Sequence, residues 1–263
     1  MNLESVLRFT EFLLILSLLQ KSIEFIWLET SRRRERAMPH FYDCFHIDNE
    51  NEVHNLALWK RLIQKNYLSL LWVFVFLCIL QIFVPSFILS FSLLIAYFLI
   101  LQRWQGLFNG GSDYMTVVAL VGVMIARWPS DDVIYEKVGL VYIAIQAVLS
   151  YFIAGWVKIR RKEWIDGKAL RHFVSDSPFS VPKRLRDFVR HRPISLLLGW
   201  AVLFFELTFP LALISEPTLI GYVFFAIIFH LVIWWMFGLN RFVFSWMVTY
   251  PSLFYLSFLV RQV

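Results

Sequence analysis

The chain alternates between long apolar runs and polar segments. The clearest apolar run covers residues 67–102 and contains no charged side chain, with a single interruption at Pro85. A helix rises 1.5 Å per residue, so about 20 apolar residues cross the core of a bilayer. Proline lacks an amide hydrogen and disfavours helix in the residue before it. The run therefore predicts two membrane-spanning helices joined by a tight turn at Pro85.

Other apolar runs predict further spans, and the first of them is interrupted by polar residues. Residues 9–28 contain Glu11, Gln20, Lys21 and Glu24, so this segment either crosses the membrane or lies at its surface. We favour a span, because charged residues of a membrane helix can face the interior of a bundle. The remaining spans are expected at residues 114–126, 138–157, 194–214, 218–237 and 242–260.

These runs predict an all-α fold, a polytopic transmembrane helical bundle of seven or eight spans that forms a single domain over residues 1–263. The composition agrees, because 59% of the residues are hydrophobic, 18% are aromatic and the mean hydropathy is +0.63. These values lie above those of soluble globular proteins, and little of the chain is left for a soluble domain.

Positive charge is concentrated in two polar segments. Residues 31–66 carry seven Lys and Arg residues and residues 158–192 carry eleven, whereas the loops predicted on the opposite side carry only Lys137. Basic loops of membrane proteins stay in the cytoplasm, so both segments are expected there, in a multi-pass protein of the cell inner membrane. The net charge of +6 is therefore attributed to the orientation of a protein in contact with the lipid bilayer, and it does not indicate nucleic-acid binding.

Polar groups inside the spans are candidates for chemistry, because burying them in lipid is costly. Glu206 and His230 occupy the middles of two spans joined by a short turn at residues 215–217, so these spans should be antiparallel neighbours. Counted from that turn, the two residues differ in depth by about 6 Å. They can therefore form a proton-handling or ligand-binding pair, or a polar pair that only fixes the register of the helices.

Lys158 ends the span at residues 138–157. At 100° per residue, Tyr151 falls on the same helix face, so both side chains are expected in one groove. The alternative is a lysine that extends to the membrane surface and marks its edge.

The segment Asn109, Gly110, Gly111, Ser112 and Asp113 precedes a short span. Paired glycines break a helix, and Ser112 or Asp113 can cap the next one. Free amides at a helix start inside the membrane are used to hold ligands, so we predict a cofactor contact here. The alternative is an ordinary loop and cap.

A metal site is not predicted. His40, Cys44 and His46 lie close together in a polar segment with further His and Asp residues. Their spacing matches no standard set of metal ligands.

The run from Tyr151 to Gly155, followed by Lys158, Trp164 and Gly167, resembles the vitamin K-dependent γ-carboxylase family. More narrowly, it is similar to the transmembrane domain that this family shares with bacterial proteins, the HTTM domain. The similarity continues through Glu206, the Phe229–His230 pair and the aromatic-rich last span, and is strongest over residues 104–258.

The resemblance implies an enzyme that uses a reduced quinone, whose oxygenation yields a base that removes a carbon-bound proton from a peptide or small substrate. It places Lys158 as the base, with His230 and Glu206 as polar partners and Tyr151 beside the cofactor. The chain departs from the carboxylase pattern at Val157, where those enzymes have a second lysine. Lys158 also falls on the predicted cytoplasmic side, which differs from carboxylation on the far side of a membrane.

Two other function classes stay open at this point. One is a non-catalytic membrane subunit with a protein partner, for maturation or export of a peptide, similar to HTTM proteins of the sporulation-delaying toxin system. The other is a small-solute transporter, which the absence of repeated halves in the sequence makes the weaker alternative.

The charge distribution generates a topology prediction. Reporters fused after Asn51 and after Lys183 should both report the cytoplasm, and a reporter after Asp132 should report the opposite side, because basic segments are retained inside. Paired alkaline phosphatase and fluorescent-protein fusions measure this. An external Lys183 would show that the span count between the two basic segments is wrong.

Overall fold

The computed structural model describes residues 2–34, 63, 65–102, 110–175 and 181–262, and all secondary structure in these ranges is helical. This confirms the all-α prediction. The elements are α1 (Leu3–Arg34), α5 (Tyr67–Phe83), α6 (Phe87–Gln102), α7 (Gly110–Ala126), α8 (Ile134–Ile159), α9 (Lys162–Ile165), α10 (Lys168–Ser175), α11 (Lys183–Arg190), α12 (Arg192–Thr208), the 3-10 helix η1 (Phe209–Leu213), α13 (Glu216–Phe237), α14 (Asn240–Met247) and α15 (Tyr250–Val260).

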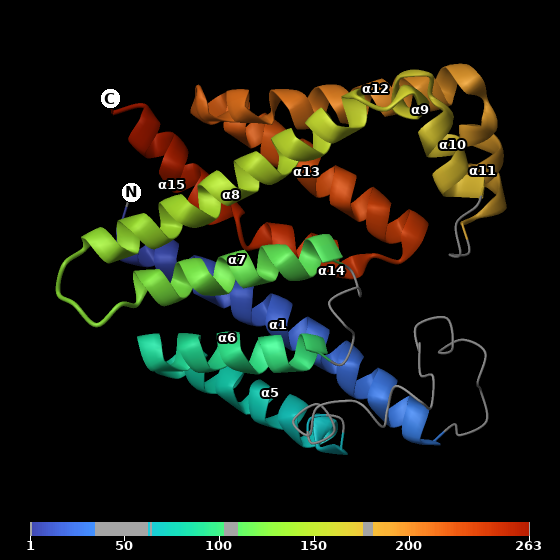
Figure 1. The fold of residues 1–263 in the computed structure, drawn as a ribbon. Coiled ribbons are helices and arrows are strands. Elements are labelled where there is room, and N and C mark those ends of the chain that lie inside the picture. The colour runs from blue at the N-terminus through green and yellow to red at the C-terminus, as the bar shows by residue number, and fades with distance from the viewer. Residues whose placement is uncertain (1, 35–62, 64, 103–109, 176–180, 263) are drawn as a thin grey trace.

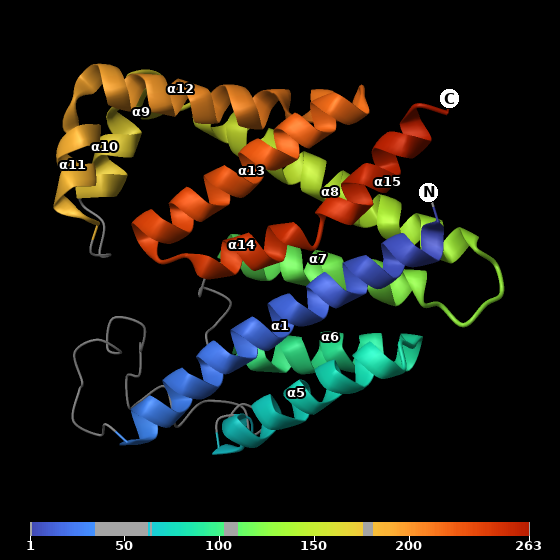
Figure 2. The ribbon, with the colours of Figure 1, turned by 180° about the vertical axis from the view of Figure 1, so that it is seen from behind.

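The long helices run side by side between two ends of the bundle (Figure 1). The α5–α6 hairpin forms one edge, α12 and α13 form the other, and α1, α7 and α14 lie between them (Figure 2). The end of α1, the start of α5 and the short helices α9–α11 share one end of the bundle. The α7–α8 turn and both chain termini lie at the other end. Successive long helices thus run in opposite directions, which agrees with the predicted span count that places the two basic segments at one end.

Several helices have the length and composition of membrane spans. Among the residues that the structure describes, four segments qualify fully, namely α8, α12 with η1, α13, and α14 with α15, while α5, α6 and α7 are apolar but shorter. Helices of 16 or 17 residues, such as α5–α7, lie at the short limit for crossing a bilayer. Bulky apolar side chains cover the outer face of α13, including Phe224, Ile228 and Trp235. Such a face is suited to contact lipid instead of water.

Helix α1 extends beyond the predicted residues 9–28 and occupies the interior of the bundle. Its 32 residues correspond to a length of about 48 Å, and it packs against α5, α7, α8, α14 and α15. Within the described ranges, Glu11, Lys21 and Glu24 of α1 pair with charges farther along the chain, which offsets the cost of burying them. These pairs are Glu11–Arg127 (2.7 Å), Lys21–Asp113 (3.2 Å) and Glu24–Arg241 (2.6 Å).

The predicted span over residues 242–260 is confirmed as a candidate membrane span at Asn240–Val260, but it is not one continuous α-helix. The chain instead forms α14 and α15, which are separated at Val248 and Thr249. Pro251 has no amide hydrogen to donate to a carbonyl of the preceding turn, and its backbone geometry suits the first turn of a new helix. The Thr249 hydroxyl donates to the carbonyl of Trp246 (2.8 Å), which satisfies a group at the end of α14.

The prediction that Gly110 and Gly111 break the helix and that Ser112 or Asp113 caps the next one is wrong. Helix α7 already includes Gly110 and Gly111, so Ser112 and Asp113 lie inside the helix and are not its caps. Both are buried, and both the Ser112 carbonyl and the Asp113 carboxylate accept hydrogen bonds from Lys21. The tertiary contact with α1 therefore outweighs the low helix propensity of the glycines.

Helices α7 and α8 cross closely at a pair of glycines. A Cβ atom added to Gly139 would lie 2.3 Å from the carbonyl oxygen of Gly122 and 2.7 Å from the Cβ of Ala126. Small residues at such crossings let helix backbones approach, as is common in membranes. Gly221 on α13, by contrast, has open space around its Cβ position.

This crossing predicts opposite effects for two matched substitutions. Gly139→Ala should lower the thermal midpoint of the detergent-solubilised protein, because the methyl group forces the backbones apart at a cost of about 1–3 kcal/mol. Gly221→Ala should leave the midpoint unchanged or raise it slightly. Fluorescence-detected size-exclusion chromatography after heating measures both, and equal midpoints would contradict the close crossing.

Candidate functional site

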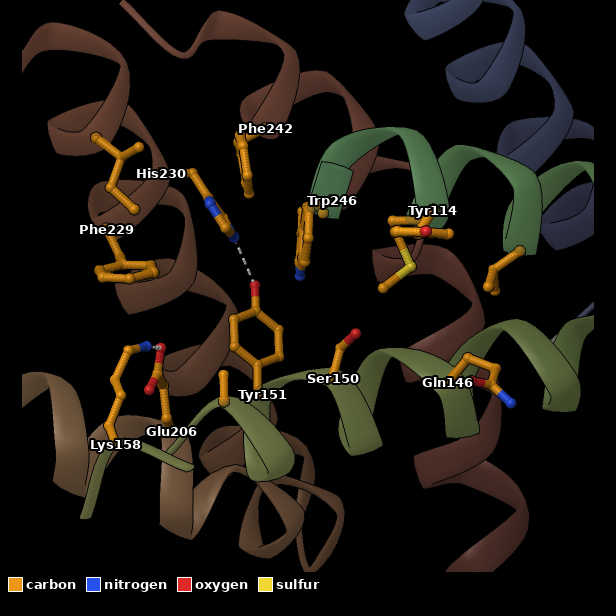
Figure 3. Close-up of a pocket in the computed structure, with 15 residues that line it drawn as sticks. Tyr114, Gln146, Ser150, Tyr151, Lys158, Glu206, Phe229, His230, Phe242 and Trp246 are labelled. Carbon is orange, nitrogen blue, oxygen red and sulfur yellow. Dashed lines mark hydrogen bonds and ion pairs between the residues drawn. The ribbon is translucent and has the colours of Figure 1, made fainter. Parts of the chain in front are cut away.

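The central cavity of the bundle lies among α7, α8, α12, α13 and α14 and has a volume of about 480 Å³. Figure 3 shows its wall, in which Lys158 and Glu206 lie at one end, Tyr151 and His230 lie in the middle, and Gln146 lies toward the other end. The volume falls in the range of small-molecule sites, which are typically 300–1,000 Å³. Its lining combines aromatic rings with a few polar side chains, as in binding sites for aromatic ligands.

An ion pair lies at one end of this cavity. The Lys158 ammonium on α8 donates to the Glu206 carboxylate on α12, whose side chain is only 3% exposed. Gly155 permits the approach, because a Cβ atom there would lie 2.9 Å from the Cβ of Glu206. The Lys158 Nζ also lies 5.2 Å from the ring centre of Trp164 on α9. Its pairing with a buried carboxylate shows that Lys158 is not simply a lysine that extends to the membrane edge.

A second polar pair lies beside it. The Tyr151 hydroxyl and the His230 Nε2 are 2.8 Å apart and share a hydrogen bond. The Tyr151 ring stacks on Phe209 with a centroid distance of 4.0 Å, and the His230 ring lies 5.0 Å from that of Trp246. These contacts hold both rings in place. The expectation that Tyr151 and Lys158 share one groove is confirmed, because both line the cavity.

The direct pair between Glu206 and His230 that their depths allow is not formed. Glu206 bonds to Lys158 and His230 bonds to Tyr151, so α8 supplies a partner to each. Helix α8 packs on α12 and its Tyr151 reaches α13, an arrangement that residue depths alone cannot reveal. Glu206 Oε2 and His230 Nδ1 are each buried with no hydrogen-bond partner among the described residues. Each pair therefore retains one polar atom for a ligand or water.

The other predicted site residues are distributed on different sides of α7. Gly111 lines the cavity, while Asp113 faces α1 and α6, where it accepts from Lys21 and from the Tyr97 hydroxyl (2.7 Å). Ser112 is buried and its carbonyl accepts from Lys21, and Gly110 precedes the cavity wall at the start of α7. Asn109 lies outside the described residues.

Metal binding has no candidate within the described ranges, where no group of three His, Cys, Asp or Glu side chains is arranged to hold an ion. His40, Cys44 and His46 lie outside those ranges.

Four residues of the cavity wall were missed by sequence reasoning. Phe242 and Trp246 lie one helical turn apart on α14, and Gln146 and Ser150 lie one turn apart on α8. The spacing of four residues places each pair on one helix face, which is the signal that could have found them. Within apolar runs, however, nothing distinguishes a cavity face from a lipid face.

A larger and mostly apolar cavity, whose wall also includes Arg161, Glu163 and His172, adjoins the first. Its volume is about 840 Å³, and it lies among the end of α8, the short helices α9 and α10, and helices α12, α13 and α14. The two cavities share Lys158, Phe229, Ile233 and Phe242 as wall residues. Lys158 therefore stands at the junction between an apolar chamber and a polar one.

Comparison with known protein families assigns the chain. The profile of the HTTM domain matches residues 35–258, which is most of the sequence and all of the helices that line the cavities. The chain belongs to the HTTM-domain family. It is accordingly a membrane protein of the HTTM family, and α1 precedes the matched region. No curated protein and no solved structure matches the chain.

The two polar pairs of this HTTM-family protein generate a prediction for double-mutant cycles. Lys158→Met with Glu206→Gln, and Tyr151→Phe with His230→Leu, should each show coupling, since every single change leaves a buried partner unsatisfied at a cost of about 1–3 kcal/mol. Glu206→Gln with His230→Leu should be additive. Thermal midpoints in detergent measure all three cycles, and coupling in the third alone would refute the observed pairing.

Proposed function

We propose that this protein is an integral-membrane enzyme that binds a reduced quinone, or a similar lipid-soluble aromatic ligand, in the central cavity. The observation that carries the proposal is the Lys158–Glu206 ion pair at the junction of an aromatic-lined cavity and an apolar chamber. A buried ion pair is weak support for stability, because desolvation offsets much of the attraction. Ionisable residues inside membranes instead commonly mark functional sites.

The two chambers match the two parts of such a ligand. The aromatic head fits the polar cavity, where Phe242 and Trp246 stack with a centroid distance of 5.3 Å and offer their faces to a ring. An isoprenoid tail fits the apolar chamber of about 840 Å³. The unpartnered Glu206 Oε2 and His230 Nδ1 would meet the oxygens of the head group. When bound, a reduced quinone would supply the electrons for the reaction.

Lys158 and Glu206 supply a proton-accepting site. In a low-dielectric setting the proton of such a pair can lie on either partner, because the ion pair gains attraction but loses solvation. When Glu206 holds the proton, the neutral Nζ of Lys158 can accept another from a ligand hydroxyl beside it. The Glu206 side chain is only 3% exposed, which restricts exchange of its proton with bulk water.

Tyr151 and His230 orient the ligand and extend the proton-handling set. The hydrogen bond to the Tyr151 hydroxyl fixes His230 Nε2, which leaves Nδ1 as the atom that can donate or accept. In this proposal dioxygen and carbon dioxide are the co-substrates of a carboxylase-like reaction on a peptide or small substrate in the same cavity, in which oxidation of the quinol reduces dioxygen. Lys158 would be the base that accepts the hydroxyl proton of the quinol, with Glu206 and His230 as its partners.

Lys158→Arg tests this role. Guanidinium keeps the charge and can pair with Glu206 but cannot lose its proton at working pH. We therefore expect expression and thermal midpoint close to wild type, retention of any co-purified quinone in organic extracts analysed by mass spectrometry, and loss of turnover in quinol-oxidation assays.

The matched control is Lys162→Arg, an exposed lysine on α9 that should affect none of these readouts. Full turnover by Lys158→Arg would remove the base assignment. Absence of quinone from both wild-type and variant extracts, together with no saturable binding of added menaquinol, would overturn the cofactor assignment.

A further inference from the structure

Helices α7 and α8 form a V that opens toward the lysine end of α8. They touch at Gly122 and Gly139 and diverge from that crossing, as Figure 1 shows. In the open part, Tyr114 of α7 lies across the cavity from Gln146 and Ser150 of α8 (Figure 3), and Val118 of α7 also lines the cavity. Tyr114 is 72% exposed and both α8 residues are half-buried. The central cavity therefore reaches the outer surface of the bundle between these two helices.

Two polar side chains in this opening lack partners. Gln146 and Ser150 lie near the middle of the 26-residue α8, yet neither has a hydrogen-bond partner among the described residues. Several hydroxyls on other helices donate to the carbonyl four residues earlier, as Ser22 on α1, Ser92 on α6 and Thr208 on α12 do. Ser150 makes no such bond. At membrane depth an unpartnered polar group is costly, so these two positions call for a ligand or water.

Among the described wall residues, the end of the cavity near Gln146 and Ser150 has no acidic or basic side chain. The charged residues of the cavity wall, Lys158 and Glu206, lie at its other end, and Ser150 is about 12 Å from Lys158 along the helix axis. The Gln146 amide and the Ser150 hydroxyl can each both donate and accept. A group that donates and accepts without carrying charge is their best complement, and an amide has this property.

We propose that Gln146 and Ser150 form a second subsite that binds the amide group of a membrane-embedded substrate, which enters between α7 and α8. The inference rests on the proposed function and adds the class of its second reactant. The quinone-like ligand occupies the ion-pair end and the apolar chamber. The amide-bearing substrate approaches from the lipid side, so the two reactants meet near Tyr151 and Lys158.

A reporter thiol in the cavity wall tests the subsite. In a Cys44→Ser and Cys78→Ala background, Val118→Cys places one thiol in the opening, and its labelling rate by N-ethylmaleimide is followed in detergent. Decanamide should slow labelling about fivefold more than methyl decanoate, since the ester lacks the donor and one net hydrogen bond accounts for such a factor. Acetyl-trileucine amide, a short apolar peptide, distinguishes a peptide source of the amide from a fatty amide.

Matched variants identify the groups responsible. Gln146→Leu and Ser150→Ala should make the amide and the ester equivalent, whereas Ser150→Thr, which keeps the hydroxyl, and Leu149→Ala, on the lipid side of α8, should retain the preference. The thermal midpoint of each variant confirms that it is folded.

Equal protection by amide and ester in the parent protein, or a preference that survives both Gln146→Leu and Ser150→Ala, would overturn the subsite. Protection by decanamide but not by the peptide would limit its substrate to fatty amides. Amide preference in a protein that binds no menaquinol would retain the subsite and reject the proposed cofactor, so the two failures are distinguishable.

Discussion

The internal pairing of charges is the constraint on which this membrane bundle depends. In lipid, an unpaired ammonium or carboxylate is costly, so each charged side chain of the interior needs a partner on another helix. The partners of Glu11, Lys21 and Glu24 of α1 lie, in that order, just after α7, on α7 and on α14. A helix with this many charges would be a poor span alone. Because its charges match those of the later helices, it can occupy the interior of the bundle.

Close backbone contacts then decide where space remains. Gly139 brings α8 against α7, and Gly155 brings α8 against α12, so α8 is held at two points along its length. Since α7 and α12 diverge from it in different places, a cavity is left between these points, with Tyr151 inside it. The same Gly155 contact brings Glu206 within reach of Lys158. The close packing at Gly155 therefore also determines the position of the Lys158–Glu206 pair.

Hydropathy was sufficient to predict an all-helical membrane bundle, because lipid permits few alternatives to helices for a spanning chain. It also placed Lys158 and Tyr151 in one groove, since helical periodicity fixes which residues share a face. Periodicity within one helix does not determine which helices are neighbours, so the partners of Glu206 and His230 could not be derived. The helical state of Gly111 and Ser112 was hidden for the same reason, because it is stabilised by contacts with Lys21 on a distant segment.

Helix α14 connects the charged interior to the cavity. Its Arg241 and Ser245 face α1 and α7, where Ser245 shares a hydrogen bond with Thr116 (3.1 Å) and Thr116 accepts one from Lys21. Its Phe242 and Trp246 line the cavity on a neighbouring face, about 100° around the helix. The ion pair between Arg241 and Glu24 ties this eight-residue helix to α1. Helix α1, which precedes the HTTM-matched region, therefore helps to position the aromatic wall of the site.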